Sequence, residues 1–176
     1  MSRPSHQAFT AQARIDTPLG PLTAARNAHG LAGLWFDAQR HHPGVIEAPQ
    51  LQPGDDELLA GTAALLDDYF AGRPLPADLR GLPLAPQGTL FQQAVWQALR
   101  QIPSGSSRSY GELATALGHS QGARAVGAAV GRNPISVLVP CHRVLGADGS
   151  LTGYAGGIAR KKALLALERH PLAALC

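Results

Sequence analysis

The sequence predicts an α+β fold in two parts, a small sheet-and-helix unit followed by a mostly helical unit. Three short segments in the first 36 residues alternate apolar and polar side chains, as antiparallel strands do. The second half instead repeats apolar residues three and four positions apart, which is typical of helices. A stretch with four prolines, residues 73–87, separates the two patterns. We therefore expect one domain over residues 1–86, ending in this Pro-rich connection, and a second over residues 87–176.

The first half is expected to form a small α/β domain, a three-stranded antiparallel sheet packed on one helix. The expected strands cover residues 8–15, 20–26 and 31–36. Residues 43–54 have the composition of a loop. A helix then begins at Asp55, because acidic residues favour the positive end of the helix dipole, and Gly72 ends it.

The second half predicts a helix-turn-helix, in a winged-helix-like arrangement. A first helix runs from an N-cap at Thr89 to residue 102, and a basic helix covers residues 160–170. Between them, short helices over residues 110–117 and 123–132 flank a Gly-containing turn, which is the layout that many proteins use against DNA.

The second short helix has an unusual composition for a helix that reads base sequence. It consists almost entirely of Ala, Gly and Val, and Arg124 is its one long charged side chain before the end. Small residues allow the helix backbone to approach a groove closely, which suits a minor-groove binder that ignores base sequence. The alternative is that they only allow tight helix packing.

Charge is distributed unevenly along this chain of 176 residues and net charge +3. Residues 1–87 carry six Arg and nine acidic residues, a net of −3, whereas residues 88–176 carry nine Lys or Arg and three acidic residues, a net of +6. A basic half favours a polyanionic partner, of which nucleic acid is the commonest. Basic surfaces also serve solubility, which is the competing interpretation.

The composition also bears on the cellular setting and on metals. With 45% hydrophobic residues the chain can bury a core, and neither a signal-peptide core nor a run of membrane-spanning length is present. Two cysteines, Cys141 and Cys176, do not make a disulfide framework, so we expect a cytoplasmic protein. The neighbouring pair His41-His42 lacks further ligands at suitable spacing, so we expect no metal.

The apolar run over residues 135–144 delivers Cys141 directly before His142. A thiol attacks as its thiolate, and a neighbouring base or positive charge increases the ionised fraction. His142 and Arg143 make the local environment basic, and Pro140 stiffens the approach. Alternatively, Cys141 is a buried structural residue that ends a β-strand, since free cysteine behaves as a small hydrophobe. The pair alone leaves both interpretations open.

A catalytic Cys-His pair needs a third group that orients and polarises the imidazole. Glu112 and Glu168 are the only glutamates in the basic half, and Glu168 is the better candidate because it stands alone among four basic residues of its helix. A solvated ion pair is the ordinary alternative for such a residue.

The motif Pro140-Cys-His-Arg-Val144 resembles the active-site motif of the O6-alkylguanine-DNA alkyltransferases, also called methylated-DNA–protein-cysteine methyltransferases. The resemblance covers 80 residues, Thr89 to Glu168, and the first half matches only in layout. Its further motifs are Ser109-Tyr-Gly-Glu-Leu-Ala114, Ala123-Arg-Ala-Val-Gly127, Asn133-Pro134, Gly153-Tyr-Ala-Gly-Gly157 and Lys161.

The resemblance implies DNA repair by irreversible transfer of an alkyl group from O6-alkylguanine to the protein's own cysteine. It leaves open whether O4-alkylthymine is also a substrate. The implied catalytic residues are Cys141 as alkyl acceptor, His142 as base through a water, Glu168 to polarise it, Asn133 to hold the turn before the active-site strand, and Tyr110 to press the 3′ phosphate and donate a proton. A thioether has no good leaving group, so the protein acts once.

The same resemblance implies a DNA-binding surface and a pocket for a flipped base, because O6 of guanine is inaccessible inside the duplex. The DNA-binding residues are Arg124, which fills the gap in the base stack, with Tyr110, Gly111, His119 and Gln92. The pocket comprises backbone groups of Cys141 and Val144 and a wall of Tyr154, Ala155 and Gly156. The implied partner is double-stranded DNA bound by a monomer, with no cofactor and no membrane.

Two positions depart from the family pattern. Ala155 stands where some members carry a serine that bonds O6, so a backbone N–H must serve there, and Gly131 stands where some carry an arginine, which weakens binding. The first half lacks the Cys and His ligands of zinc-bearing relatives. Rival functions are a damage sensor without chemistry, although such relatives replace the cysteine, and a Cys-His-Glu hydrolase, which would need an oxyanion hole.

Overall fold

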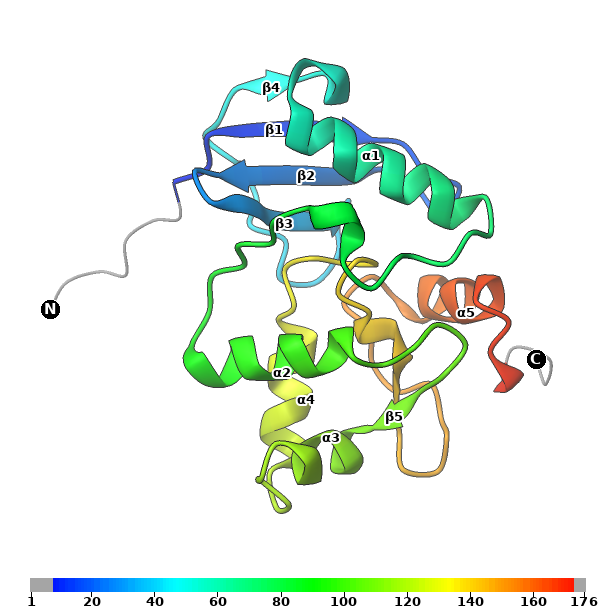
Figure 1. The fold of residues 1–176 in the computed structure, drawn as a ribbon. Helices are drawn as coiled ribbons and strands as arrows, with labels where there is room; N and C mark the ends of the chain where they lie inside the picture. Colours follow the sequence, from blue (N-terminus) through cyan, green and yellow to red (C-terminus); the bar gives the residue numbers. More distant parts are fainter. Residues whose placement is uncertain (1–7, 173–176) are drawn as a thin grey trace, which may run out of the picture.

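The computed structural model describes residues 8–172, so Cys176 lies outside the described residues. It confirms the α+β class, with a sheet in the first half and helices in the second (Figure 1). The sheet has the order β3-β2-β1-β4. Its strands are β1 (Ala11–Ile15), β2 (Leu22–Asn27), β3 (Gly30–Phe36) and β4 (Gln50–Leu51), and helix α1 (Glu57–Phe70) covers one face.

The three expected strands are present, and the sheet gains a fourth, β4, from the segment over residues 43–54 that was expected to be a loop. β1 and β2 pair antiparallel, as do β2 and β3, whereas β4 pairs parallel to β1. The side-chain amide of Gln12 in β1 donates to the carbonyls of Ile46 and Ala48, 2.9 Å from each, and so holds the segment against the sheet. A two-residue strand has no periodicity that the sequence could reveal.

The Pro-rich segment is packed along the sheet and does not hang free. Leu31 in β3 donates its N–H to the carbonyl of Pro83 at 2.8 Å, and Ala85 donates to the carbonyl of Leu31 at 2.7 Å. A short 3₁₀ helix, Leu79–Gly81, lies in the same segment. The chain therefore extends the sheet edge at β3 before it enters the second half.

The second half contains the expected helices, with shifted ends. They are α2 (Leu90–Arg100), α3 (Tyr110–Ala116), α4 (Ala123–Gly131) and α5 (Ile158–Leu167). Thr89 caps α2 through a reciprocal capping box with Gln92, and Ser109 caps α3 in the same way with Glu112. α3 and α4 pack against each other across the turn and form the helix-turn-helix.

The chain that leads to Cys141 is not a strand, which corrects the expectation of an active-site strand. Only Ile135 bridges to β3, at Leu34, and Cys141–Arg143 forms a 3₁₀ turn. Directly after it, the two-residue strand β6 (Val144–Leu145) pairs parallel with β5 (Arg108–Ser109), which precedes α3. The apolar run looked like a strand in sequence because its residues are buried on all sides.

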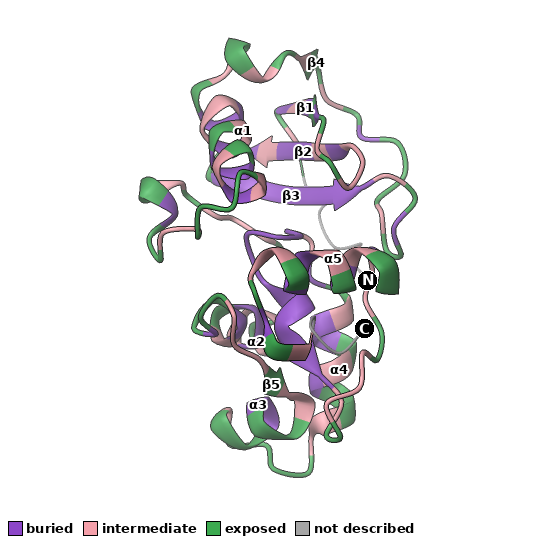
Figure 2. Ribbon diagram, turned by 90° about the vertical axis from the view of Figure 1, so that its right-hand side faces the viewer, coloured by how far each residue is buried: buried purple, intermediate pink, exposed green. Residues whose placement is uncertain are grey.

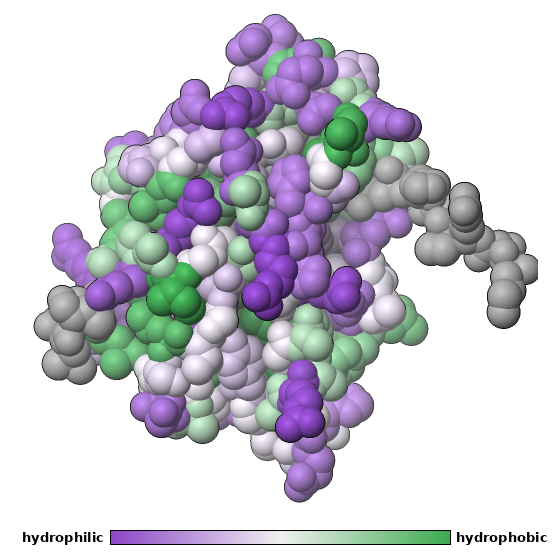
Figure 3. All heavy atoms as spheres, turned by 180° about the vertical axis from the view of Figure 1, so that it is seen from behind, coloured by the Kyte–Doolittle hydropathy of each residue, from purple (hydrophilic) through white to green (hydrophobic). Residues whose placement is uncertain are grey.

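One hydrophobic cluster continues from the sheet into the helical half. It joins Phe36 of β3, Leu66 of α1, Leu99 of α2 and Leu164 of α5, each no more than 1% exposed. Figure 2 shows buried residues concentrated in the sheet and in the segments between the helices below it. On the face shown in Figure 3, hydrophilic side chains surround smaller apolar patches, as on most folded proteins.

Candidate active site

The residues before Cys141 form a folded loop that Asn133 holds from inside. Its amide donates to the carbonyls of Val139, at 2.9 Å, and Ile135, at 3.2 Å, and its Oδ1 accepts the N–H of Ile135 at 3.0 Å. Val137 adopts a left-handed conformation, with φ +69°, which is strained for a β-branched residue. This backbone conformation costs free energy, and the loop that contains it holds Cys141 in a fixed position, where the residue is 5% exposed.

Beside the cysteine, Glu168 is the centre of a buried polar cluster. Its Oε1 accepts from His142 Nε2 at 2.7 Å and from the hydroxyl of Tyr69 at 2.7 Å. Arg143 donates two hydrogen bonds to the same carboxylate, from Nε to Oε2 at 2.9 Å and from Nη2 to Oε1 at 2.8 Å. Arg143 also donates to the carbonyl of Ile102. The carboxylate is thus fully engaged, and its side chain is only 2% exposed.

The cluster fixes the tautomer of His142. A carboxylate only accepts hydrogen bonds, so the Nε2 of His142 carries the proton that it shares with Glu168. The other ring nitrogen, Nδ1, then carries a lone pair instead of a proton, and it is buried without a hydrogen-bond partner among the described residues. His142 therefore presents an unoccupied proton acceptor within a closed site.

Burial sets the resting protonation of the three groups. It raises the pKa of the Cys141 thiol, although the Asn133 amide and the charge of Lys161 act in the opposite direction. It lowers the pKa of His142 despite the attraction of Glu168. Burial would raise the pKa of Glu168, but hydrogen bonds from His142 and Arg143 outweigh it and hold that pKa far below its usual range. At rest the site holds a thiol, a neutral imidazole and a carboxylate.

Lys161 is a buried cation whose charge acts on the cysteine. Its ammonium donates to the carbonyls of Thr152 and Gly153, 3.1 Å from each, and to the carbonyl of Val144. Burial lowers its pKa to about 8, so much of it stays protonated at neutral pH. Lys161 thus ties the loop after the cysteine to α5 and places a positive charge near the thiol.

Cys141 lines a cavity of about 290 Å³ between α4 and the loop over residues 153–155. Tyr110 stands at its edge and donates its hydroxyl to the carbonyl of Thr152 at 3.2 Å. Ligand pockets begin at roughly 300 Å³, so the cavity suits a small planar group. The remaining lining residues are Arg40, His41, Gly127, Ala128, Val130, Gly131, Arg132, Gly153, Tyr154 and Ala155.

The four residues predicted for the base pocket besides Cys141 fall in different places. Tyr154 and Ala155 line the cavity, and the Tyr154 hydroxyl is buried without a partner among the described residues. Gly156 lies behind the wall, where a Cβ would come within 2.7 Å of the Tyr154 ring. Val144 does not line the cavity either, and its carbonyl is engaged by Lys161.

The residues predicted to bind DNA lie on or near α2, α3 and α4. Arg124 and Gly111 are exposed on the two helices of the helix-turn-helix. His119 is also exposed and rests edge-on against Phe91, with ring centroids 5.4 Å apart. Gln92 is different, because its side-chain oxygen accepts the N–H of Thr89 at 2.9 Å and so caps α2.

The rival glutamate, Glu112, is occupied elsewhere. Its carboxylate accepts the N–H of Ser109 at 2.6 Å in the capping box of α3, remote from His142. The structure therefore brings Glu168 and not Glu112 to the imidazole.

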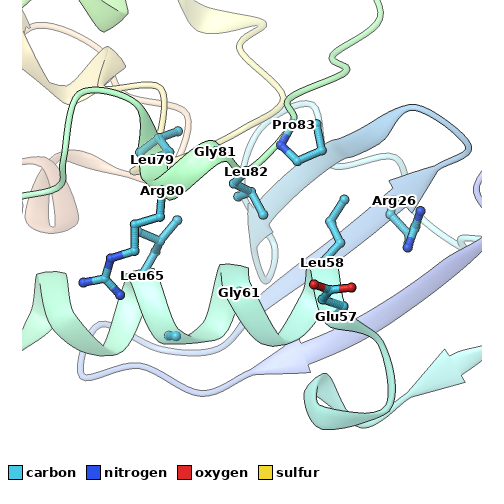
Figure 4. A pocket seen from close by; sticks show the side chains of 11 residues that line it. Arg26, Glu57, Leu58, Gly61, Leu65, Leu79, Arg80, Gly81, Leu82 and Pro83 are labelled. Atoms are coloured by element: carbon cyan, nitrogen blue, oxygen red, sulfur yellow. The ribbon is translucent and has the colours of Figure 1, made fainter.

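A larger cavity, of about 470 Å³, lies in the first half between α1 and the 3₁₀ segment (Figure 4). Its two arginines are already paired, Arg26 with Asp56 and Arg80 with Asp68. Apolar side chains such as Leu58 and Leu82 form much of the remainder. It offers no nucleophile and no unpaired buried charge, so the chemistry belongs to the cavity at Cys141.

From the sequence, Tyr69 was not singled out, Arg143 had only the role of making the surroundings of Cys141 basic, and Lys161 had no role. A tyrosine on the apolar face of a helix has the same periodicity as an ordinary core residue, so its periodicity does not reveal a polar role. The sequence signal that could have exposed Arg143 and Lys161 is a charged residue inside an otherwise apolar face. Within residues 8–172, no three His, Cys, Asp or Glu side chains gather as metal ligands would, and no helix could cross a bilayer.

The fold and the site together define a class: a helix-turn-helix protein with a buried cysteine next to a His–Glu pair, opening on a small cavity beside the helices. Comparison with known proteins then gives the family. The model of the 6-O-methylguanine DNA methyltransferase DNA binding domain matches residues 90–170, and that of its ribonuclease-like domain matches residues 12–86. The chain belongs to the family of methylated-DNA–protein-cysteine methyltransferases.

Individual relatives and solved structures point to the same family. Methylated-DNA–protein-cysteine methyltransferases from Mycobacterium tuberculosis and Methanosarcina acetivorans are 48% and 43% identical, and each match covers 88% of this chain and 90% and 95% of the relative. A crystal structure of Mycobacterium tuberculosis OGT in complex with DNA has a TM-score of 0.80 at 44% identity, covering 91% of this chain and 93% of that chain. A Pyrococcus kodakaraensis O6-methylguanine-DNA methyltransferase reaches 0.61 at 26% identity, covering 90% and 98%.

Proposed function

We propose that this protein repairs DNA by transferring the alkyl group of O6-alkylguanine to its own Cys141, once per molecule. The observation that carries the proposal is the buried thiol on a cavity beside a His142–Glu168 pair whose free ring nitrogen has no hydrogen-bond partner within residues 8–172. The printed names of the relatives describe the same activity for those proteins. A thiol nucleophile needs a reducing compartment, so we keep the cytoplasm as its proposed location.

The chemistry starts from a protonated thiol, because burial raises the pKa of Cys141. His142 takes the proton at Nδ1, directly or through one water, and Glu168 stabilises the resulting imidazolium. Sγ then attacks the alkyl carbon, the carbon–O6 bond breaks, and its electron pair stays on the guanine. The guanine takes up one proton, so a thiol and an alkylguanine become a thioether and guanine.

Tyr110 is the proposed donor of that proton. Its hydroxyl stands at the cavity edge, and burial raises its pKa, so it stays protonated at neutral pH. Turning away from the Thr152 carbonyl would free it to face the leaving base or the 3′ phosphate. Asn133 has a positioning role, because it holds the loop that carries Cys141.

Arg124 and the short helices supply the proposed DNA contacts. α4 presents small residues such as Gly127 and Ala128 to the cavity, so a DNA groove can approach its backbone closely. Arg124 projects from the exposed part of α4, where it can occupy the space left by a flipped base. Gly111 and His119 extend the surface, whereas Gln92 contributes through the cap of α2.

The substrate base is proposed to lie between α4 and the wall of Tyr154 and Ala155. The backbone of the wall supplies polar groups that can read it, and Tyr154 contributes its ring, since its hydroxyl is buried. Gly156 allows the wall to lie close to Phe36, where a Cβ would come within 3.2 Å of that ring. We also keep the division into domains over residues 1–86 and 87–176, the first supporting and the second reacting.

Mass spectrometry of the intact protein after mixing with duplex DNA that contains O6-methylguanine tests the proposal. We expect one added methyl group, located on Cys141 by peptide mapping and saturating at one equivalent. Tight binding of that DNA with an unchanged protein mass would favour the damage sensor instead. Repeated turnover without a modified cysteine would favour a hydrolase.

A further inference from the structure

Three basic residues form a rim around the mouth of the Cys141 cavity, and none belongs to the expected DNA-binding set. Arg40 and His41 come from the segment after β3 in the first half, and Arg132 is the C-cap residue of α4. All three are exposed. No acidic side chain is among the described residues that line this cavity. We call Arg40, His41 and Arg132 the cationic rim.

The two arginines of the rim form no ion pair with any acidic side chain in the described part of the chain. Within residues 8–172, the arginines that form ion pairs are Arg14, Arg26, Arg73, Arg80 and Arg143. Asp37, the nearest acid in sequence to Arg40, pairs with Arg14. Partial desolvation and then the charges of Arg132 and Arg40 lower the pKa of His41, and all three residues line the same cavity.

The segment that carries Arg40 is anchored to the reacting centre from two sides. The N–H of Arg40 donates to the carbonyl of Ala155, in the cavity wall, at 2.9 Å. The side-chain oxygen of buried Gln39 accepts the N–H of Phe36 at 2.8 Å and the hydroxyl of Ser136, in the Cys141 loop, at 3.0 Å. The backbone of this part of the rim is therefore held in a fixed position relative to the thiol. This reduces the conformational entropy that the rim loses when it binds a ligand.

We infer that the cationic rim binds the phosphate groups of the DNA strand that carries the extruded nucleotide. The inference rests on the proposed function. A base inside the cavity stays linked through its sugar to two phosphates, which must then lie at the mouth. Arginine matches phosphate oxygens with two parallel N–H donors, and neutral His41 can add one more donor. The acidic first half of the chain thus contributes a DNA contact of its own.

Arginine also recognises the guanine edge through O6 and N7, which is the competing role for the same side chains. The two roles differ in what they need from the substrate. A contact to phosphate requires a DNA strand, whereas a contact to the base edge would also hold free O6-benzylguanine. Comparison of the two substrates therefore separates them.

The test uses Arg40→Gln, Arg132→Gln and the double variant, with Arg100→Gln as the matched control. Arg100 lies in the basic second half, as Arg132 does. It is exposed at the end of α2 and does not line the cavity. Affinity for a duplex with one O6-methylguanine is measured against salt concentration in a Cys141→Ser background, which prevents reaction. Each lost phosphate contact should reduce the slope of log affinity against log salt by about 0.9, and the double variant by about 1.8.

With Cys141 intact, alkyl transfer from the duplex at low protein concentration should fall more in the rim variants than transfer from free O6-benzylguanine. Salt slopes of the rim variants equal to that of Arg100→Gln would overturn the inference, and so would equal losses on the duplex and the free base. Failure of the unchanged protein to accept an alkyl group from either substrate would instead overturn the proposed function.

Discussion

The two halves of the molecule differ in how much of their function can be predicted from their sequences. The second half has a net charge of +6 and carries the Cys-His pair, whereas the first has a net charge of −3 and no recognisable reactive motif. Nevertheless the first half reaches into the site, because Tyr69 donates to Glu168 at 2.7 Å and Gln39 bonds Ser136 at 3.0 Å. The comparison teaches that the reacting residues of one half are held in place by the other.

Arg160 makes the same connection from the opposite direction. It lies 4.5 Å above the ring of Phe36, donates to the carbonyl of Leu19 at 2.9 Å, and donates to the carbonyl of Gly156 at 3.0 Å. One side chain of α5 thus joins the sheet of the first half to the cavity wall of the second. Structural support for the wall is shared between the halves.

Replacement of Cys141 should have the largest effect and locate the chemistry in the second half alone. Cys141→Ser is expected to abolish alkyl transfer, because a hydroxyl is far less nucleophilic than a thiolate, and to retain affinity for DNA. Protein mass after exposure to alkylated DNA and a binding titration check the two parts. Loss of DNA binding by a folded variant would contradict this division of roles.

Arg124→Ala should come next, because it acts on base extrusion and not on bond formation. Extrusion of a base costs a few kcal/mol, so the rate on duplex DNA should fall on the order of 10- to 100-fold. Single-turnover rates on the duplex and on free O6-benzylguanine provide the measurement, and the duplex should lose far more. Arg124→Lys serves as control for charge alone, and equal losses on both substrates would argue against a role in the base stack.

Tyr69→Phe tests the contribution of the first half to the reacting centre. The change removes a hydrogen bond to a buried carboxylate, worth about 1.5 to 3 kcal/mol, so unfolding should become easier. Because two other side chains keep Glu168 in place, only part of this loss should reach the transition state, and transfer should slow by roughly tenfold or less. His142 and Arg143 still hold Glu168, so Glu168→Gln should slow transfer more.

A merely structural role for Tyr69 would lower stability and leave the pH profile of transfer unchanged. If Tyr69 instead positions Glu168 for His142, Tyr69→Phe should shift the acid limb of that profile. Leu65→Val, a change on the same helix at a buried residue that lines the other cavity, is the matched control for stability.

The pH dependence should show the smallest effect and sharpen the role of His142. Burial lowers the pKa of His142 below 6.5, so the imidazole remains neutral and able to accept a proton in mildly acidic solution. The midpoint of the acid limb of transfer from free O6-benzylguanine should therefore lie below pH 6.5. A rate already halved at pH 6.5 would indicate an imidazole that is not desolvated.

Much of the second half could be predicted because its signals are local. Thr89 with Gln92 and Ser109 with Glu112 make capping boxes three residues apart, and both helices begin where these pairs place them. The same locality misled elsewhere, because an apolar run before Cys141 resembled a strand while its backbone folds into a loop around Asn133. The fourth strand was missed because two residues are too few to show a pattern.

The sequence by itself determined the α+β class, the helix-turn-helix, and the placement of Cys141 beside His142, since each depends on residues within a turn or two of each other. Only the tertiary structure decided that Glu168 lies against His142 across 26 residues, that Tyr69 joins them across 99, and that the rim surrounds the same cavity. Contacts over such separations leave no periodicity in the chain, because they depend on how finished elements pack against one another.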